Sequence, residues 1–190
     1  YDGVGNLSNV NSIWPDIDLK DVGAQKASGT FTEYGGVVTG VADWWEIKGA
    51  ELEIHLLGGV DGIAFKSVEV NHDGSYAKAV GEIGWFNFFY WKAEAEAQDV
   101  NPETFLVPFP GRVNGIVKSD GEIGYEDGDE LSCVFDINEI DGVLRDYNVD
   151  GHGTLLVQGT ELEVDKFFLT SGDSHIFVTG VLSDELDFAF

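Results

Sequence analysis

Apolar and polar residues alternate along most of this chain, in short runs that Gly, Asp and Asn separate. In residues 51–56 and 161–168 nearly every second residue is apolar, and acidic residues stand between them. A period of two is typical of a half-buried strand, so both runs are predicted to be strands. Eight further runs show the same pattern: 25–34, 37–47, 63–71, 75–83, 111–118, 142–149, 153–158 and 175–182.

Turn signals recur roughly every 8–12 residues, a spacing typical of a β-sandwich or barrel. Helix signals are weak: residues 15–22 favour a short helical turn, and residues 92–98 favour a helix by propensity alone. The prediction is therefore an all-β, antiparallel, jelly-roll-like β-sandwich with extended terminal segments. Residues 16–190 would form this single domain, and residues 1–15 an extended N-terminal segment.

The chain carries a net charge of −25, with 35 Asp and Glu against 10 Lys and Arg. Such a surface repels nucleic acid and anionic membranes, and no apolar run is long enough to span a membrane as a helix. Oxygen-rich turns instead favour hard cations, above all calcium. Adaptation to brine is an alternative reason for the acidity, although Lys outnumbers Arg here.

Residues 146–154, with the sequence DYNVDGHGT, match the first half of a calcium loop. Asp146, Asn148 and Asp150 precede Gly151, but Val157 stands where a bidentate Glu is expected. Another residue would have to complete the shell, and an ordinary hairpin turn is an equal alternative. A second acidic cluster lies at residues 120–130. The candidate calcium ligands are Asp146, Asn148, Asp150, His152, Glu161, Glu122, Asp127 and Asp129.

The run 85–98 begins with six aromatic residues among its first seven and ends with alternating Ala and Glu. Read as a strand, one face carries Phe89, Trp91 and three Ala, and is predicted to be core. The other face begins aromatic and ends charged, so its first half must be covered or form an interaction site. The candidate interface or ligand aromatics are Trp44, Trp45, Phe86, Phe88 and Tyr90.

Both termini carry spaced apolar residues that could pair within the sheet or with a neighbouring subunit. The possible donated strands are Val4, Leu7, Val10 and Ile13, or Leu186, Phe188 and Phe190. The chain begins with Tyr and holds no Met, so we expect a signal peptide to have been removed. The single Cys133 lies in an apolar row and is predicted to be core.

The sequence holds no serine-hydrolase, zinc-protease or phosphate-loop motif, and its four His are scattered, so we expect no enzyme. The β-body, spaced terminal residues and acidic turns resemble in profile the extracellular filament and tubule proteins of archaea and bacteria, such as cannula and TasA-type subunits. That resemblance implies a secreted structural subunit that assembles with copies of itself into a fibre, tubule or coat at the cell surface, by strand exchange and calcium bridging. The alternative is a calcium-stabilised carbohydrate-binding sandwich that stacks polysaccharide on its aromatics.

Overall fold

The structure, a computed structural model, describes residues 3–7, 10–11, 17–30, 32–44, 47–104, 109–124, 130–182 and 186–189. Side chains are described for residues 20–23, 28–30, 32–44, 47–104, 109–124 and 130–182. Within these residues the chain is almost entirely β-strand, with one 3₁₀ turn, η1 (Pro102–Thr104). The strands are β1 (Gly3–Leu7), β2 (Val10–Asn11), β3 (Ile17–Gly29), β4 (Glu33–Trp44), β5 (Ile47–Gly59), β6 (Gly62–His72), β7 (Ser75–Gly84), β8 (Phe89–Val100), β9 (Gly111–Ile123), β10 (Ser132–Leu144), β11 (Tyr147–Gln158), β12 (Glu161–Ser171), β13 (Ser174–Leu182) and β14 (Leu186–Ala189).

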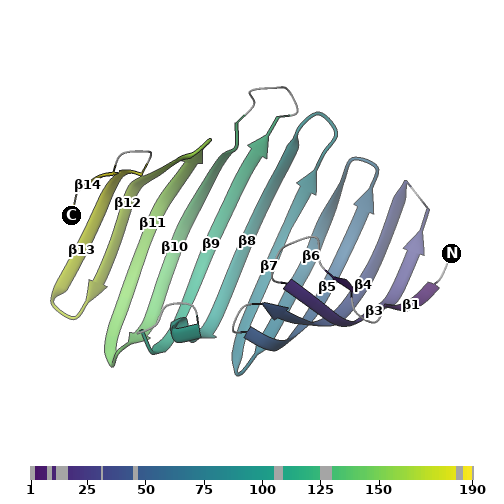
Figure 1. Cartoon of the computed structure of the whole chain (residues 1–190), viewed down its shortest axis with the longest axis horizontal. Helices are drawn as coiled ribbons and strands as arrows, with labels where there is room; N and C mark the ends of the chain where they lie inside the picture. The colour runs from purple at the N-terminus through teal and green to yellow at the C-terminus, as the bar shows by residue number, and fades with distance from the viewer. Residues whose placement is uncertain are drawn as a thin grey trace.

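All these strands belong to one antiparallel sheet in which strands adjacent in sequence are neighbours in space. The order runs from β1 through β3 and β4 to β14, and β2 pairs with the side of β3. Figure 1 shows the strands from β7 to β13 side by side, while the purple N-terminal strands run across the view, and the two chain ends lie at opposite ends of the sheet. Each strand from β4 to β13 is hydrogen-bonded on both edges, so its backbone polar groups are satisfied within the sheet.

Short hairpin turns fix this order. The turn Asp73–Gly74 between β6 and β7 has φ values of 46° and 79°, and the turn Arg145–Asp146 between β10 and β11 has φ values of 48° and 68°. Positive φ at both central residues is the signature of the type I′ hairpin, whose twist matches that of the flanking strands. Such a turn returns the chain directly beside the strand it has left, so the strands form a meander.

The all-β antiparallel prediction is confirmed, but the sandwich is not. A sandwich needs connections that cross from one sheet to another, whereas every described connection joins strands that are neighbours in the same sheet. The two helical expectations were wrong as well: β3 begins at Ile17, and residues 92–98 lie inside β8. The predicted boundary between residues 15 and 16 lies outside the described residues.

The buried core is small for a chain of this size. Four apolar residues are buried, Ala50, Cys133, Val149 and Val164, and among the described residues no side chain is fully buried. The accessible surface is 12801 Å², against about 8,900 Å² expected for a globular monomer of this mass. The excess surface is what a single-layer sheet leaves open when no second layer covers it.

Candidate binding surface

One face of the sheet is apolar from β4 to β13. Residues directly opposite in neighbouring strands share a face, and the register places Ile54 opposite Val68, Ala79 opposite Ala95, and Phe135 opposite Leu155. We call this surface the apolar face. Its larger members include Tyr34, Val38, Leu52, Ile54, Leu56, Ile63, Phe65, Val68, Val70, Ile83, Trp91, Val113, Val117, Cys133, Phe135, Ile137, Ile140, Leu144, Val149, Leu155, Val157, Leu162, Val164, Phe167, Leu169, Ile176, Val178 and Leu182.

The strand register places no Asp, Glu, Lys or Arg of the described part of the chain on the apolar face between β4 and β13. Polar side chains of this face lie mostly at strand ends, such as His72, Ser171 and Ser174. Near the middle, the Trp91 indole N–H donates to Ser119 Oγ at 3.0 Å. The centre of the face therefore offers an external ligand apolar contact and almost no hydrogen bonding.

Small side chains line the apolar face on β7 and β8, where Ala77 and Ala79 face Ala97 and Ala95. On β9, Gly115 lies opposite Ala97, and Val117 lies opposite Ala95. Larger side chains stand on both sides, from β5 and β6 on one and from β10 to β12 on the other. This arrangement gives a floor of small residues between two apolar walls.

Aromatic rings cover glycines of the neighbouring strand at three places on the apolar face. A Cβ built on Gly121 would lie 2.1 Å from Trp91 Cζ2, and one on Gly58 would lie 2.3 Å from Tyr34 Cζ. Phe167 lies over Gly153 in the same way, with 2.6 Å to its Cδ2. Each ring fills the space that a side chain would occupy, so it lies along the surface instead of standing up from it.

The opposite face, which we call the polar face, carries the charges. Lys78 and Glu69 pair at 3.3 Å there, as do Lys118 and Glu94. All four side chains are partly exposed, so each pair contributes little to stability. The two faces together explain the alternation in the sequence. Of two consecutive residues in a strand, one lies on the water-exposed polar face and the other lies on the apolar face.

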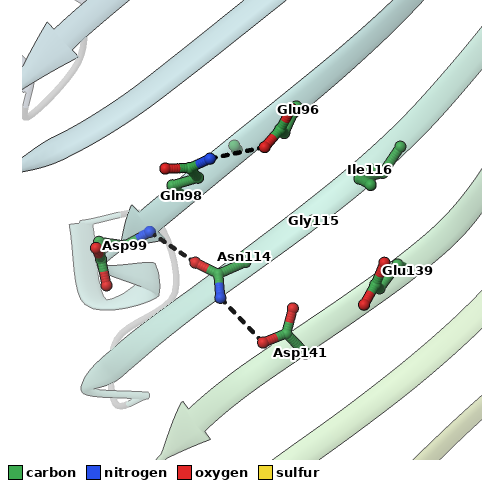
Figure 2. A pocket seen from close by; sticks show the side chains of 9 residues that line it. Glu96, Gln98, Asp99, Asn114, Gly115, Ile116, Glu139 and Asp141 are labelled. Atoms are coloured by element: carbon green, nitrogen blue, oxygen red, sulfur yellow. Dashed lines mark hydrogen bonds between the residues drawn. The ribbon is translucent and has the colours of Figure 1, made fainter.

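A cavity of 370 Å³ lies on the polar face over β8, β9 and β10, and Figure 2 shows the side chains that line it. Asn114 organises it, because its Oδ1 accepts from the Asp99 backbone N–H at 2.9 Å and its Nδ2 donates to Asp141 Oδ2 at 2.9 Å. Glu96 and Glu139 complete an acidic lining. The Asn114 amide thus joins the end of β8 to β10 through β9.

The structure spreads the predicted calcium ligands along the sheet. Asp146 lies in the β10–β11 turn, while Asn148, Asp150 and His152 follow on the polar face of β11. Glu161 begins β12, opposite Gln158 at the far end of β11, and Glu122 lies on β9. Among the residues that the structure describes, no three His, Cys, Asp or Glu are grouped to hold a metal ion. Asp127 and Asp129 lie outside the described residues, and calcium stays a prediction.

Two of the predicted aromatics, Phe88 and Tyr90, contact each other, Phe86 lies nearby in sequence, and Trp44 is distant. Phe86 and Phe88 lie in the β7–β8 connection, and the Phe88 and Tyr90 rings are 5.7 Å apart. Trp44 ends β4, four strands away from β8, and Trp45 lies outside the described residues. The predicted core face of this run, with Trp91 and the alternating Ala, is part of the apolar face.

Both terminal segments pair within the chain's own sheet. β1 and β2, which hold Val4, Leu7 and Val10, pair with β3. β14, which holds Leu186 and Phe188, pairs with β13. The described terminal strands thus follow the first of the two alternatives, pairing within the sheet, and donation to a neighbour stays a prediction, while Ile13 and Phe190 lie outside the described residues.

Cys133 lies on the apolar face near the start of β10 and is 5% exposed. Desolvation by burial raises the pKa of its thiol, which disfavours the reactive thiolate. The prediction that Cys133 is a core residue is confirmed.

These features define a class of protein: a single-layer β-sheet scaffold that presents one long apolar face. The chain belongs to the family described as TamB, N-terminal domain, which matches residues 9–190. It is 25% identical over 188 residues to the translocation and assembly module subunit TamB of Haemophilus influenzae, covering 97% of this chain and 14% of that relative. No solved structure matches the chain. No helix among the described residues is long and apolar enough to cross a membrane.

Family membership corrects four expectations. The chain is not a secreted subunit of a fibre, tubule or coat, nor a secreted carbohydrate-binding module, because its family and its relative are named for a translocation and assembly module. Copies of itself as the partner and an extracellular or cell-surface location were wrong for the same reason. The resemblance to filament and tubule proteins was misleading, because acidic turns and an all-β body are expected of any long β-meander that has one water-exposed face.

Sequence reasoning missed the apolar face itself. The signal was present: each strand contributes a charge-free row, and two-residue turns imply a meander. The sandwich prediction assumes that a second sheet covers the apolar side of each strand.

Proposed function

We propose that this chain is a segment of a translocation and assembly module subunit whose apolar face shields acyl chains of amphiphilic molecules from water. The observation that carries the proposal is the charge-free apolar face, which no second layer covers in the described part of the chain. With about 4.8 Å between neighbouring strands, the thirteen strands of the main order extend on the order of 58 Å. The chain spans 14% of its relative's length, so this surface would be one part of a longer one.

An acyl chain fits this face better than a peptide does. A peptide carries backbone N–H and C=O groups that cost free energy when they are buried without partners. The sheet's own backbone groups are already paired on both edges from β4 to β13, and the centre of the face offers almost no side-chain partner. Hydrocarbon needs no partner, and it gains about 0.8 kcal/mol for each CH₂ that is removed from water. The Ala and Gly floor gives such a chain a place to lie.

Tryptophan quenching tests the proposal directly. In one variant Trp91 is the sole tryptophan, and in a matched variant the sole tryptophan is introduced on the polar face by Val80→Trp, with the natural tryptophans replaced by Phe. Trp91 lies in the apolar face, whereas Val80 lies opposite Glu94 and is 41% exposed. A brominated fatty acid should quench Trp91 strongly and the tryptophan at position 80 weakly. Equal quenching of both, or none of Trp91, contradicts the proposal.

Two neighbouring substitutions separate the faces. Ala79→Glu places a carboxylate in the floor of the apolar face, while Val80→Glu places the same group on the polar face, where Val80 is 41% exposed. We expect Ala79→Glu to weaken fatty-acid binding roughly 10-fold or more, because the charge must be desolvated when the acyl chain lies over it. Val80→Glu should leave binding nearly unchanged. Circular dichroism on both variants checks that the sheet still forms.

A further inference from the structure

A second cavity lies on the polar face, near the β7–β8 connection. It has a volume of 540 Å³ and is lined by residues of β7, β8, β9 and β10 together with Phe88. It opens on the face opposite the proposed acyl-chain surface, so its ligand is a different one and its role does not depend on acyl-chain binding.

The charges around this cavity are unbalanced. Lys92 lies between Glu82 on β7 and Asp120 on β9, its direct partners in the strand register. Glu122 follows on β9, opposite Tyr90. One ammonium group thus faces three carboxylates, and no described residue forms an ion pair with Lys92 within 4.0 Å. The lining of the cavity therefore carries an excess of negative charge, which at least one further cationic group could neutralise.

Aromatic side chains form the wall of the same cavity. Tyr90 lies over Gly84, where a Cβ would come 2.1 Å from its Cε1, and Phe88 contacts Tyr90 with ring centroids 5.7 Å apart. Phe88 is 40% exposed and Phe86, in the same connection, is 72% exposed. Exposed aromatic side chains grouped at one edge of a charged surface indicate an interaction site. An aromatic wall beside carboxylates also favours a cation that has an apolar stem.

We propose that this cavity is a docking site for a basic, apolar-flanked segment of a partner protein. A Lys or Arg side chain would enter between the Phe88–Tyr90 wall and the carboxylates of Glu82, Asp120 and Glu122, while a neighbouring apolar side chain covers Phe86. Charge complementarity selects this occupant: the chain has a net charge of −25, which attracts basic partners and repels anionic membranes. A compact metal ion would make no use of the aromatic wall.

The test uses a short labelled peptide of alternating Lys and Leu, with a Glu and Leu peptide as control, and fluorescence anisotropy as the readout. The triple variant Glu82→Gln, Asp120→Asn, Glu122→Gln should bind the basic peptide roughly 10-fold more weakly. The matched triple variant on β12 is Glu161→Gln, Glu163→Gln, Asp165→Asn, whose three side chains are also exposed. This control variant loses the same net charge as the cavity variant. If both variants bind the basic peptide equally weakly, the attraction comes from the overall negative charge, and the proposed docking site is overturned.

Two single substitutions test the wall and the sign of the electrostatic effect. Phe88→Ala should weaken peptide binding about 3- to 5-fold, whereas Phe177→Ala, which removes a ring 50% exposed on the polar face of β13, should not. Lys92→Gln should strengthen binding about 2- to 5-fold because it removes the competing cation. Lys78→Gln, outside the cavity, is its control.

A lipid membrane is the alternative ligand that exposed aromatic side chains could bind. Neutral phosphatidylcholine vesicles are therefore titrated in parallel with the peptide. The proposal would be overturned if the chain binds the vesicles, if Phe86→Ala and Phe88→Ala abolish that binding, and if the basic peptide binds no more tightly than the acidic control peptide. Preference for the basic peptide with no vesicle binding supports it.

Discussion

The indole ring of Trp91 lies over the Cα of Gly121, its direct partner on the next strand of the apolar face. The position is fixed from both sides: Gly121 leaves the space, and Ser119 accepts the indole N–H at 3.0 Å. In a sheet with little buried volume, this contact replaces the packing that a second layer would give. It also keeps the largest side chain of the face flat against the sheet.

Gly121→Ala should therefore displace Trp91 and destabilise the chain. The added Cβ would lie 2.1 Å from Trp91 Cζ2, and we expect a loss of about 1–3 kcal/mol in the free energy of unfolding. Gly115→Ala is the control on the same strand and face, where the nearest atom is 3.4 Å away. Its effect should stay within about 1 kcal/mol. Urea unfolding followed by tryptophan fluorescence measures both, and equal effects would contradict the role of the Trp91–Gly121 contact.

Asn114→Asp should destabilise the chain at neutral pH. The new carboxylate would meet Asp141 where the Asn114 amide now donates a hydrogen bond at 2.9 Å, and we expect a loss of about 1–3 kcal/mol. The loss should shrink as the solution is acidified, because a protonated carboxyl group can donate to Asp141 again. Asn71→Asp, at an exposed position of β6, is the control and should change stability by less than about 0.5 kcal/mol. Urea unfolding at several pH values measures both variants.

Asp43 should make stability depend on pH in the acid range. Its hydrogen-bonded ion pair with Lys20, and then the Gly49 backbone N–H that donates to Oδ1 at 2.8 Å, lower the pKa of the carboxyl group below its ordinary 3.8. A lowered folded-state pKa gives stability that is present above pH 3.8 and lost as the pH falls through the folded-state value.

The stability difference between the wild type and Asp43→Asn should accordingly be constant near neutral pH and disappear in strong acid. Urea unfolding at a series of pH values measures it. The same comparison in a Lys20→Gln background should show a smaller difference, because the largest cause of the pKa shift is gone. A difference that is independent of both pH and Lys20 would contradict this assignment.

Asp146→Gly distinguishes the hairpin turn from the predicted calcium loop. Asp146 has a φ of 68°, a conformation that costs a non-glycine residue about 1 kcal/mol. As a turn residue it should be replaceable by Gly with a gain of roughly 0.5–1 kcal/mol, with or without calcium. As a calcium ligand its replacement should instead abolish any stabilisation by calcium. Thermal unfolding in calcium and in chelator, on wild type and variant, separates the two.

The strands were predictable from local pattern, and their arrangement was not. Alternation located strands at 51–56 and 161–168 because period-two hydrophobicity is a local property of the chain. The pattern fails where local signals conflict: alternation predicts one strand over 142–149, whereas the chain turns at Arg145–Asp146, where the acidic pattern that begins at Asp146 also resembles a calcium loop. Helical propensity in residues 92–98 yielded to strand pairing with β7 and β9.

The sequence by itself determined that the chain is antiparallel β, that each strand has one charged and one apolar side, and that its surface is strongly acidic. Only the tertiary structure decided that the apolar sides form one uncovered face instead of the inside of a sandwich. The reason is that alternation states which residues avoid water within a strand, but not what covers them. That depends on whether the chain crosses to a second sheet or turns back beside itself, and here short hairpins such as Asp73–Gly74 turn it back.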